Sequence, residues 1–222
     1  MKQRLIIFGL MIVSAGLLGQ KANSIGKVIE SAIKISWVDS IGGDFSFSNN
    51  WSYPLGVEMK KDGRAGCADG GFCPRRCYSM LDSNGIVLKD SSKLFYQLLD
   101  TTHRLHSIQC EARCLEWAGT DIIVVYRIGA DSVYCYTATG ISTHCSLQLE
   151  IIKDICYATI DLNSIIPGGS KTYYCYDGYI NIDKKLWKSG IMKAEFNLNF
   201  ENKVTTGQPV YWKGKINAEI RE

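Results

Sequence analysis

The 222-residue chain is poor in several residue types and motifs that would assign it to a class of enzyme. It has only four prolines and three histidines, and its charged residues form no long run of one sign. It contains neither a G-x-S-x-G nucleophile motif nor an H-E-x-x-H zinc motif, so these two hydrolase signatures are excluded. No C-x2-C pair occurs, which removes a common spacing of structural zinc ligands.

Long apolar runs are also scarce, and the one that exists lies at the N-terminus. Residues 5–18 are apolar and follow a short basic start, and the run of about 15 residues is shorter than the roughly 20 needed to span a bilayer. Small residues at Ala22 and Ser24 suit a signal peptidase. The pattern predicts a cleaved signal peptide over residues 1–24 and a single β-rich domain over residues 25–222. The alternatives are a cut after Gly19 or an uncleaved anchor.

Removal of the signal peptide changes the charge of the chain. Its three basic residues, Lys2, Arg4 and Lys21, account for the whole formal net charge of +3. The remaining acids and bases are interspersed, which does not give the basic patch of a nucleic-acid-binding protein. We therefore expect a secreted or periplasmic protein with no nucleic-acid partner and no stable membrane span after cleavage.

Alternation of apolar and polar residues, the period of a half-buried strand, recurs along the rest of the chain. The clearest case is residues 192–200, and Ile33, Ile35 and Trp37 share one face of another. Predicted strands cover residues 31–38, 44–48, 51–59, 78–81, 86–88, 107–114, 122–128, 133–138, 142–152, 156–165, 172–182, 192–200, 210–212 and 215–220. The fold class is mostly β: an antiparallel β-sandwich or open barrel with one short helix, reinforced by disulfides.

Two local signals refine this prediction. Residues 93–106 carry a helical apolar stripe without glycine or proline, and Ser91 or Ser92 can cap it. Asn84-Gly85 between apolar runs is typical of a tight hairpin. Trp187 is expected in a loop among lysines.

Cysteine is the exception to this general scarcity, with nine residues in the chain. An exported protein favours disulfides over metal binding, so all nine are disulfide candidates and the odd count leaves one over. The candidates are Cys67, Cys73, Cys77, Cys110, Cys114, Cys135, Cys145, Cys156 and Cys175.

The strand pattern limits how these cysteines can pair. Cys110 and Cys114 share one strand face about 13 Å apart, too far to bond each other. We expect at least one of them to bond the cysteine-rich loop of residues 66–80. Cys135 faces Cys145 if the intervening hairpin loop has three residues, and His144 if it has two. In the recurring Cys-Tyr pairs, the sulfur and the ring should point to opposite faces.

Metal binding and thiol catalysis are the alternative roles for cysteines in this chain. Cys73 and Cys77 with His103 and His106 could bind zinc, but export disfavours this, and we expect no metal and no cofactor. His144 cannot serve Cys145 as a base, because adjacent strand residues point apart. The pair Arg75-Arg76 could lower the pKa of a neighbouring thiol.

Carboxylates and aromatic residues remain as functional candidates. Glu111, Glu116 and Asp121 could form an acid and base pair, although exposed acids on a wet face explain them as well. The chain is rich in rings, with five Trp and twelve Tyr, which stack on sugars or anchor protein interfaces.

We therefore expect a binding or interaction protein rather than an enzyme. A secreted hydrolase-like enzyme is the alternative. Its partner would be a protein or carbohydrate surface, and the candidate ligand-binding residues are Trp51, Tyr53 and Trp187.

Overall fold

The computed structural model describes residues 32–53, 57–59, 65–67, 75–116, 118–138, 143–164, 167–202 and 207–222, and for residues 57–59, 65–67, 75 and 76 it describes the backbone. The predicted signal peptide lies outside the described residues, as do the side chains of Cys67 and Cys73.

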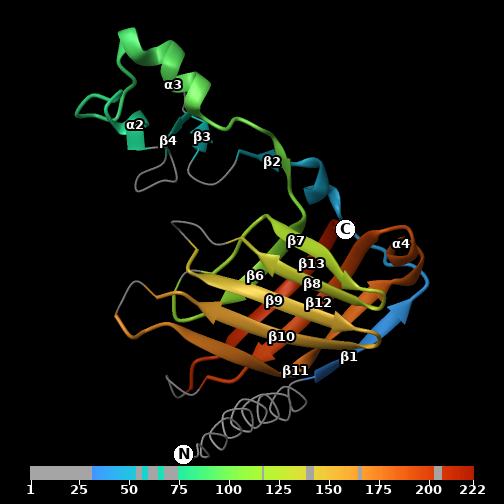
Figure 1. Ribbon diagram of the computed structural model, residues 1–222. Helices are drawn as coiled ribbons and strands as arrows, with labels where there is room; N and C mark the ends of the chain where they lie inside the picture. The colour runs from blue at the N-terminus through green and yellow to red at the C-terminus, as the bar shows by residue number, and fades with distance from the viewer. Residues whose placement is uncertain are drawn as a thin grey trace, which may run out of the picture.

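Eight strands form a closed barrel (Figure 1). They are β1 (Ala32–Val38), β7 (Ile123–Gly129), β8 (Ser132–Thr137), β9 (Cys145–Ile152), β10 (Ile155–Leu162), β11 (Lys171–Asp183), β12 (Ile191–Phe200) and β13 (Val210–Arg221). Around the ring the order is β7-β8-β9-β10-β1-β11-β12-β13, and β13 returns to β7. A further strand, β6 (Ile108–Arg113), pairs with β13 beside β7. The pairs β1–β11 and β13–β7 are parallel.

Closure of the barrel corrects the predicted sandwich or open barrel. The predicted strands at 210–212 and 215–220 are one continuous strand, β13, which pairs with β12 along ten residues. On its other side β13 pairs first with β6 and then, at Ile220 and Arg221, with β7. A strand long enough to reach β7 joins the two ends of the sheet, and closure removes the exposed edges that an open sheet would present.

Two glycines let neighbouring strands approach and bend. Gly178 in β11 has a φ of +143°, and a Cβ there would lie 2.2 Å from the carbonyl oxygen of Asn197. A Cβ on Gly214 in β13 would lie 2.2 Å from the carbonyl oxygen of Gln109 on β6. Glycine at such positions permits the sharp curvature that a small barrel needs.

The barrel interior is the main hydrophobic core, filled by alternate residues of each strand. On β12 the inward-facing side chains are at most 2% exposed: Met192, Ala194, Phe196, Leu198 and Phe200. This confirms the alternation predicted for residues 192–200. The Cys-Tyr prediction is also confirmed, because Cys175 is fully buried whereas its neighbour Tyr176 is 60% exposed. The pairs at 135–136 and 156–157 follow the same pattern.

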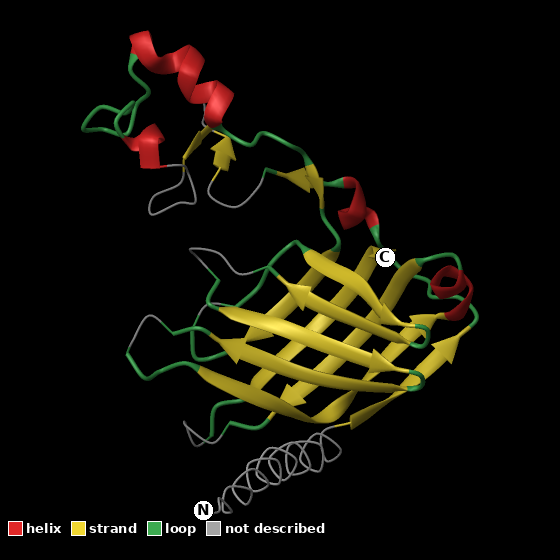
Figure 2. Ribbon diagram, in the orientation of Figure 1, coloured by secondary structure: helices red, strands yellow, loops and turns green. Residues whose placement is uncertain are grey.

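An insertion between β1 and β6 extends away from the barrel beyond its first short helix, which contacts β6 (Figure 2). It contains η1 (Ser46–Asn49), β2 (Trp51–Ser52), β3 (Val57–Met59), β4 (Ala65–Cys67), α2 (Arg75–Tyr78), η2 (Lys89–Ser91), α3 (Ser92–Leu98) and β5 (Arg104–Leu105). It has a small core of its own, formed by Cys77, Met80, Phe95 and Leu99. The fold thus has one large and one small cluster of buried apolar residues.

The insertion departs from the prediction in three places. The helix predicted over 93–106 ends at Leu98, because residues 104–105 pair with β2 instead. Most of the strand predicted at 44–48 is instead the short helix η1. The start of this helix is stabilised by a hydrogen bond from the Ser46 N–H to the Asp44 carboxylate at 2.8 Å. The hairpin predicted around Asn84-Gly85 is reduced to a turn with a single bridge between Leu81 and Val87.

A further short helix, α4 (Lys184–Lys188), occupies the predicted loop around Trp187. The described residues contain three short α-helical segments, α2, α3 and α4, of which α3 lies within the predicted helix. None of these is long and apolar enough to cross a membrane.

Candidate functional site

One rim of the barrel is built from two adjacent hairpin turns. Strand β7 turns into β8 at Ala130 and Asp131, and β9 turns into β10 at Lys153 and Asp154. The Lys153 N–H donates to the Asp131 carbonyl oxygen at 2.9 Å, so the two turns are joined. Lys153 has a φ of +54°, in the left-handed region that a tight two-residue hairpin requires. The charged turn residues are thereby gathered at one rim.

Two tryptophans come to this rim from β1 and α4. Asp183 caps α4, since its Oδ1 accepts from the N–H groups of Lys185 and Leu186 at 3.0 Å each. Its Oδ2 accepts from the Ile41 N–H at 3.1 Å, which ties the helix to the chain that follows β1. These bonds, led by the one from Leu186, lower the pKa of Asp183. The buried carboxylate thus holds Trp187 beside Trp37.

The Trp37 and Trp187 rings meet edge to face, with their centroids 5.2 Å apart and the planes at 69°. The Trp37 indole N–H donates to Asp154 Oδ1 at 2.8 Å. Both rings are partly exposed and pack on the edge of the barrel core. The orientation of the Trp37 ring is therefore set by a hydrogen bond as well as by packing.

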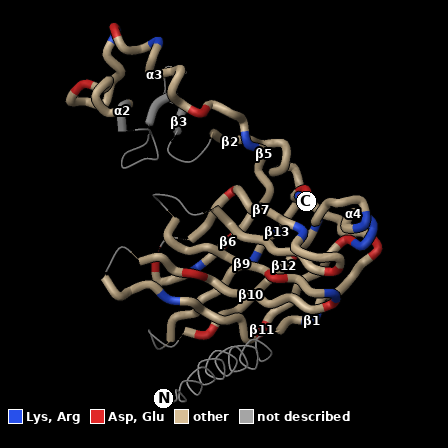
Figure 3. The backbone as a smooth tube through the Cα atoms, viewed as in Figure 1, with Lys and Arg blue, Asp and Glu red and all other residues tan. Residues whose placement is uncertain are grey.

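The rings border a hollow of about 370 Å³, here called the tryptophan hollow. Its lining residues are Trp37, Arg127, Ala130, Asp131, Lys153, Asp154 and Trp187. Acidic and basic residues are mixed at this α4 end of the barrel (Figure 3). Small-molecule sites commonly combine such a volume with aromatic walls and a few polar groups.

The other predicted ligand-binding residues lie elsewhere. Trp51 and Tyr53 are together at the base of the insertion, with ring centroids 5.3 Å apart. His103 stacks on Trp51 at 3.7 Å. Trp187 does not join this group, since its aromatic partner is Trp37. The structure thus divides the predicted residues between two aromatic sites.

The tryptophan hollow contains residues that were not singled out from the sequence. The sequence pattern places Trp37 on a strand face and Asp131 in a turn, and Asp154 falls between two predicted strands. A usable signal exists, however: in consecutive antiparallel strands, alternate turns lie at the same end. The β7–β8 and β9–β10 turns could therefore have been placed at one rim.

The opposite end of the barrel is covered by the connection from β6 to β7. Residues 114–116 and 118–121 of this connection are called the mouth segment. The Glu116 carboxylate contacts His144 Nδ1 and accepts a hydrogen bond from Ser164 Oγ. Thr143 Oγ1 donates to the Gly119 carbonyl at 2.8 Å. These bonds attach the mouth segment to the start of β9 and the end of β10.

The carboxylate between Ser164 and His144 does not produce an activated serine. In a Ser-His-Asp triad the histidine lies between the serine and the acid and takes the serine proton. Here the serine hydroxyl donates directly to Glu116, which lies in the middle. The contacts stabilise the mouth segment.

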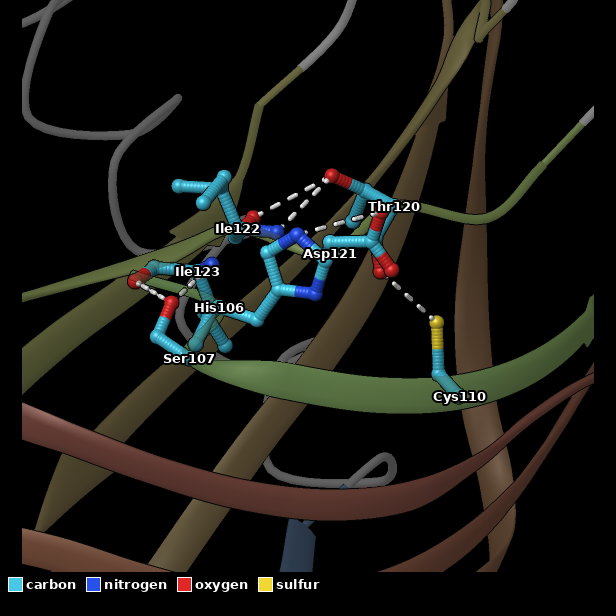
Figure 4. A network of polar contacts seen from close by, with 7 residues as sticks. All are labelled: His106, Ser107, Cys110, Thr120, Asp121, Ile122 and Ile123. Atoms are coloured by element: carbon cyan, nitrogen blue, oxygen red, sulfur yellow. Dashed lines mark hydrogen bonds and ion pairs between the residues drawn. The ribbon is translucent and has the colours of Figure 1, made fainter. Parts of the chain in front are cut away.

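A second polar network holds the return of the mouth segment to β7 (Figure 4). The Ser107 hydroxyl donates to the Ile123 carbonyl and accepts from the Ile123 N–H, both at 2.8 Å. His106 Nε2 lies 3.9 Å from Asp121 Oδ2, and Cys110 Sγ donates to the Thr120 carbonyl at 3.4 Å. A groove of about 1120 Å³ runs beside it between the barrel and the base of the insertion.

The three candidate acids have separate partners. Glu111 accepts from the Tyr211 hydroxyl at 2.6 Å and pairs with Lys213 at 3.0 Å. These contacts, with Tyr211 first, lower the pKa of Glu111. A general acid would need a raised pKa, so Glu111 is unsuited to that role.

The predicted disulfide reinforcement is not present among the cysteines whose side chains are described. No disulfide joins any two of these: Cys77, Cys110, Cys114, Cys135, Cys145, Cys156 and Cys175. Cys135 faces Leu149 rather than Cys145 or His144, because the connection from β8 to β9 is longer than two or three residues. Of the three cysteines in the loop of residues 66–80, Cys77 forms no disulfide with Cys110 or Cys114, so that form of the predicted bond is wrong. The side chains of the other two, Cys67 and Cys73, lie outside the described part of the chain.

Five of the seven described cysteine sulfurs fall into two groups. Cys135, Cys156 and Cys175 are fully buried in the barrel, where burial raises the pKa of each thiol. Cys114 and Cys145 lie at the mouth segment, where Cys145 Sγ is 3.9 Å from the Glu116 carbonyl oxygen and the Cys145 thiol lowers the pKa of Cys114 to about 7. Within the described residues, no group of three or more His, Cys, Asp or Glu side chains is arranged to hold a metal ion.

Comparisons with known proteins add no assignment. No family model, curated protein or solved structure matches the chain. Its function is therefore inferred from the chemistry of these sites.

Proposed function

We propose that the chain is an exported binding module that recognises a carbohydrate at the tryptophan hollow. The observation that carries the proposal is the pair of fixed tryptophan rings, Trp37 and Trp187, bordered by acids and bases from two hairpin turns. The expected export and the absence of nucleic-acid partners remain parts of the same proposal.

The lining suits the two kinds of surface that a sugar presents. The C–H faces of a pyranose are apolar and stack on indole rings. Its hydroxyls donate to carboxylates such as Asp131 and accept from Lys153 or Arg127. A purely apolar ligand would leave these charged groups without hydrogen bonds, at a cost in affinity.

The rings are also held before a ligand arrives. Asp154 fixes the Trp37 indole, and the Asp183 cap fixes the helix that carries Trp187. Groups ordered in advance lose little conformational entropy on binding, which favours affinity for a small ligand.

The test is a screen of the purified chain on an array of mono-, di- and oligosaccharides, followed by titration calorimetry of the hits. Trp187→Ala should weaken binding at least about tenfold, a loss of roughly 1.4 kcal/mol. The matched control is Trp51→Ala, which removes a 44% exposed tryptophan from the other aromatic site and should leave the affinity unchanged. Absence of any bound saccharide, or a loss confined to Trp51→Ala, would contradict the proposal.

The same saccharides distinguish the proposed binding module from the alternative, a hydrolase-like enzyme. A binding module releases the saccharide unchanged, whereas a glycosidase shortens it, and the hollow does contain two carboxylates, Asp131 and Asp154. Prolonged incubation followed by chromatography should show no shortened product. Cleavage that is lost in Asp131→Asn would replace the binding module with an enzyme.

A further inference from the structure

The groove of about 1120 Å³ between the base of the insertion and the barrel is here called the seam groove. One wall is formed by residues 103–107, which include β5, and the other by residues 217–221 of β13 with residues 122–125. Figure 3 shows β5 beside the C-terminal end of β13. Of the described residues, none lines both this groove and the tryptophan hollow, so the two sites are separate.

Strand β5 has an unpaired edge on the side of the groove. Leu105 is opposite Trp51 of β2, and the next residue, His106, donates its N–H to the Asn50 carbonyl at 2.9 Å. Backbone groups alternate between the two sides of a strand, so the N–H and C=O of Leu105 point away from β2. Leu105 lines the groove, whereas Trp51 does not. The Leu105 backbone groups therefore face the groove.

Strand β13 has a gap in its pairing at the opposite wall. On the side away from β12, it is in register with β6 as far as Ile216 and with β7 from Ile220 onward. Residues 217–219 are in neither register, and they line the groove. Because the Ile220 N–H donates to the Gly190 carbonyl beside β12, the preceding N–H, that of Glu219, points to the other side, toward the gap.

Both walls are held in place by contacts within the fold. The Asn217 N–H donates to the Ser107 carbonyl at 2.9 Å, and the Ser107 hydroxyl bonds both backbone groups of Ile123. On the other wall, His103 stacks on Trp51 with ring centroids 3.7 Å apart. Backbone groups that are ordered in advance lose little conformational entropy when a ligand binds.

The charged side chains that line the groove favour an acidic ligand. Besides the histidines they are Arg104, Glu219 and Arg221, so arginines outnumber carboxylates. Arg104 lies 3.8 Å from Asp100, and both of these side chains are about half-exposed. An exposed ion pair at this distance is weak, whereas a ligand carboxylate can form two parallel hydrogen bonds with a guanidinium group.

We propose that the seam groove binds an extended, acidic peptide segment of another protein by strand addition at the β5 edge. In this binding mode main-chain hydrogen bonds supply affinity and side-chain contacts supply specificity. The main-chain partners are the N–H and C=O of Leu105 and the N–H of Glu219, and Arg104 and Arg221 select acidic side chains. The Leu105 side chain, which is 64% exposed, adds apolar contact. The proposed carbohydrate site shares no lining residue among those described, so either proposal can fail alone.

The first experiment screens a displayed library of random linear peptides against the immobilised chain, and enriched peptides are synthesised and titrated by calorimetry. The bound peptides should carry Asp or Glu. N-methylation of their central backbone amides, one at a time, should weaken binding at least about tenfold at one or more positions, because it removes a hydrogen-bond donor. Absence of any bound peptide, peptides without acidic residues, or unchanged affinity throughout the N-methyl series would overturn the proposal.

The second experiment changes the edge of β5. Leu105→Pro removes the N–H that faces the groove and leaves the hydrogen bond from His106 to Asn50 intact. It should weaken peptide binding at least about tenfold. The matched control, Leu105→Ala, keeps this N–H and should lose less affinity. Circular dichroism checks that both variants fold, and the N-methylated peptides test the same bonding with the wild-type chain. Equal affinities of the two variants would refute strand addition at β5.

The third experiment tests the charge preference and the identity of the partner. Arg221→Gln should weaken binding of the acidic peptides but not of the same peptides with Asn and Gln in place of Asp and Glu. The matched control is Arg113→Gln on β6, which does not line the groove and should bind as wild type. Equal effects of the two substitutions would refute the assigned role of Arg221. Sedimentation of the wild-type chain should show no self-association through the groove; a dimer that Leu105→Pro abolishes would assign the groove to a second copy and overturn the proposal.

Discussion

Residues of the same type have different pKa values in this fold because their surroundings differ, as the cysteines show. The pKa of Cys114 is lowered, whereas the pKa of Cys110 is raised, mainly by burial. Burial, followed by the charges of Cys114, Cys145 and Glu116, raises the pKa of Tyr173 to about 12, so its hydroxyl stays protonated at neutral pH. The Cys145 thiol has the largest effect on the pKa of Cys114.

The rate of Cys114 alkylation should therefore follow an unusual pH dependence. A lowered pKa means that the thiolate is present above about pH 7 and is lost as the pH falls through that value. Iodoacetamide labelling of the reduced chain, quantified by mass spectrometry for each peptide, should be half-maximal for Cys114 near pH 7. Cys110 in the same sample is the internal control and should still gain reactivity above pH 9. Identical profiles for the two would contradict the assigned environment.

At the scale of elements, the bend of β11 depends on a position without a side chain. Gly178→Ala would place a methyl group against the Asn197 carbonyl and 2.9 Å from the Leu198 Cα, at a φ that favours glycine. Backbone cannot yield as a flexible side chain can, so we expect the free energy of unfolding to fall by about 1–3 kcal/mol. Denaturant unfolding followed by circular dichroism measures this loss.

The matched control is Gly42→Ala. No atom lies within 4 Å of a Cβ at Gly42, and its φ is not in the left-handed region. Its stability should stay within about 0.5 kcal/mol of wild type, as for most surface substitutions. Equal losses in the two variants would show that strand crowding at Gly178 is not the cause.

At the scale of the whole molecule, the two separate cores predict that the insertion is dispensable for the barrel. The His106 N–H donates to the Asn50 carbonyl at 2.9 Å, so the ends of residues 51–105 are adjacent. Replacement of these residues by a short Gly-Ser linker should leave a cooperatively unfolding β-rich protein, since the cluster of Phe95 and Leu99 is separate from the barrel core. Loss of cooperative unfolding in this variant would mean that the insertion supports the barrel.

Much of the fold follows from the sequence by itself, because a strand with one buried face must alternate apolar and polar residues. This determined the strands of the C-terminal half, the faces of β12 and the opposite directions of each Cys-Tyr pair. The alternation predicts these features without showing which strands are neighbours, because it is a property of each single strand.

Only the tertiary structure decided the features that join distant segments. Closure of the barrel depends on the pairing of Ile220 and Arg221 with β7. The early end of α3 depends on the pairing of residues 104–105 with β2. The tryptophan hollow brings together β1, α4 and two hairpin turns, and the Glu116 carboxylate joins the mouth segment to His144 and Ser164. Local periodicity carries no information on such contacts, because they are set by the order and curvature of the strands around the barrel.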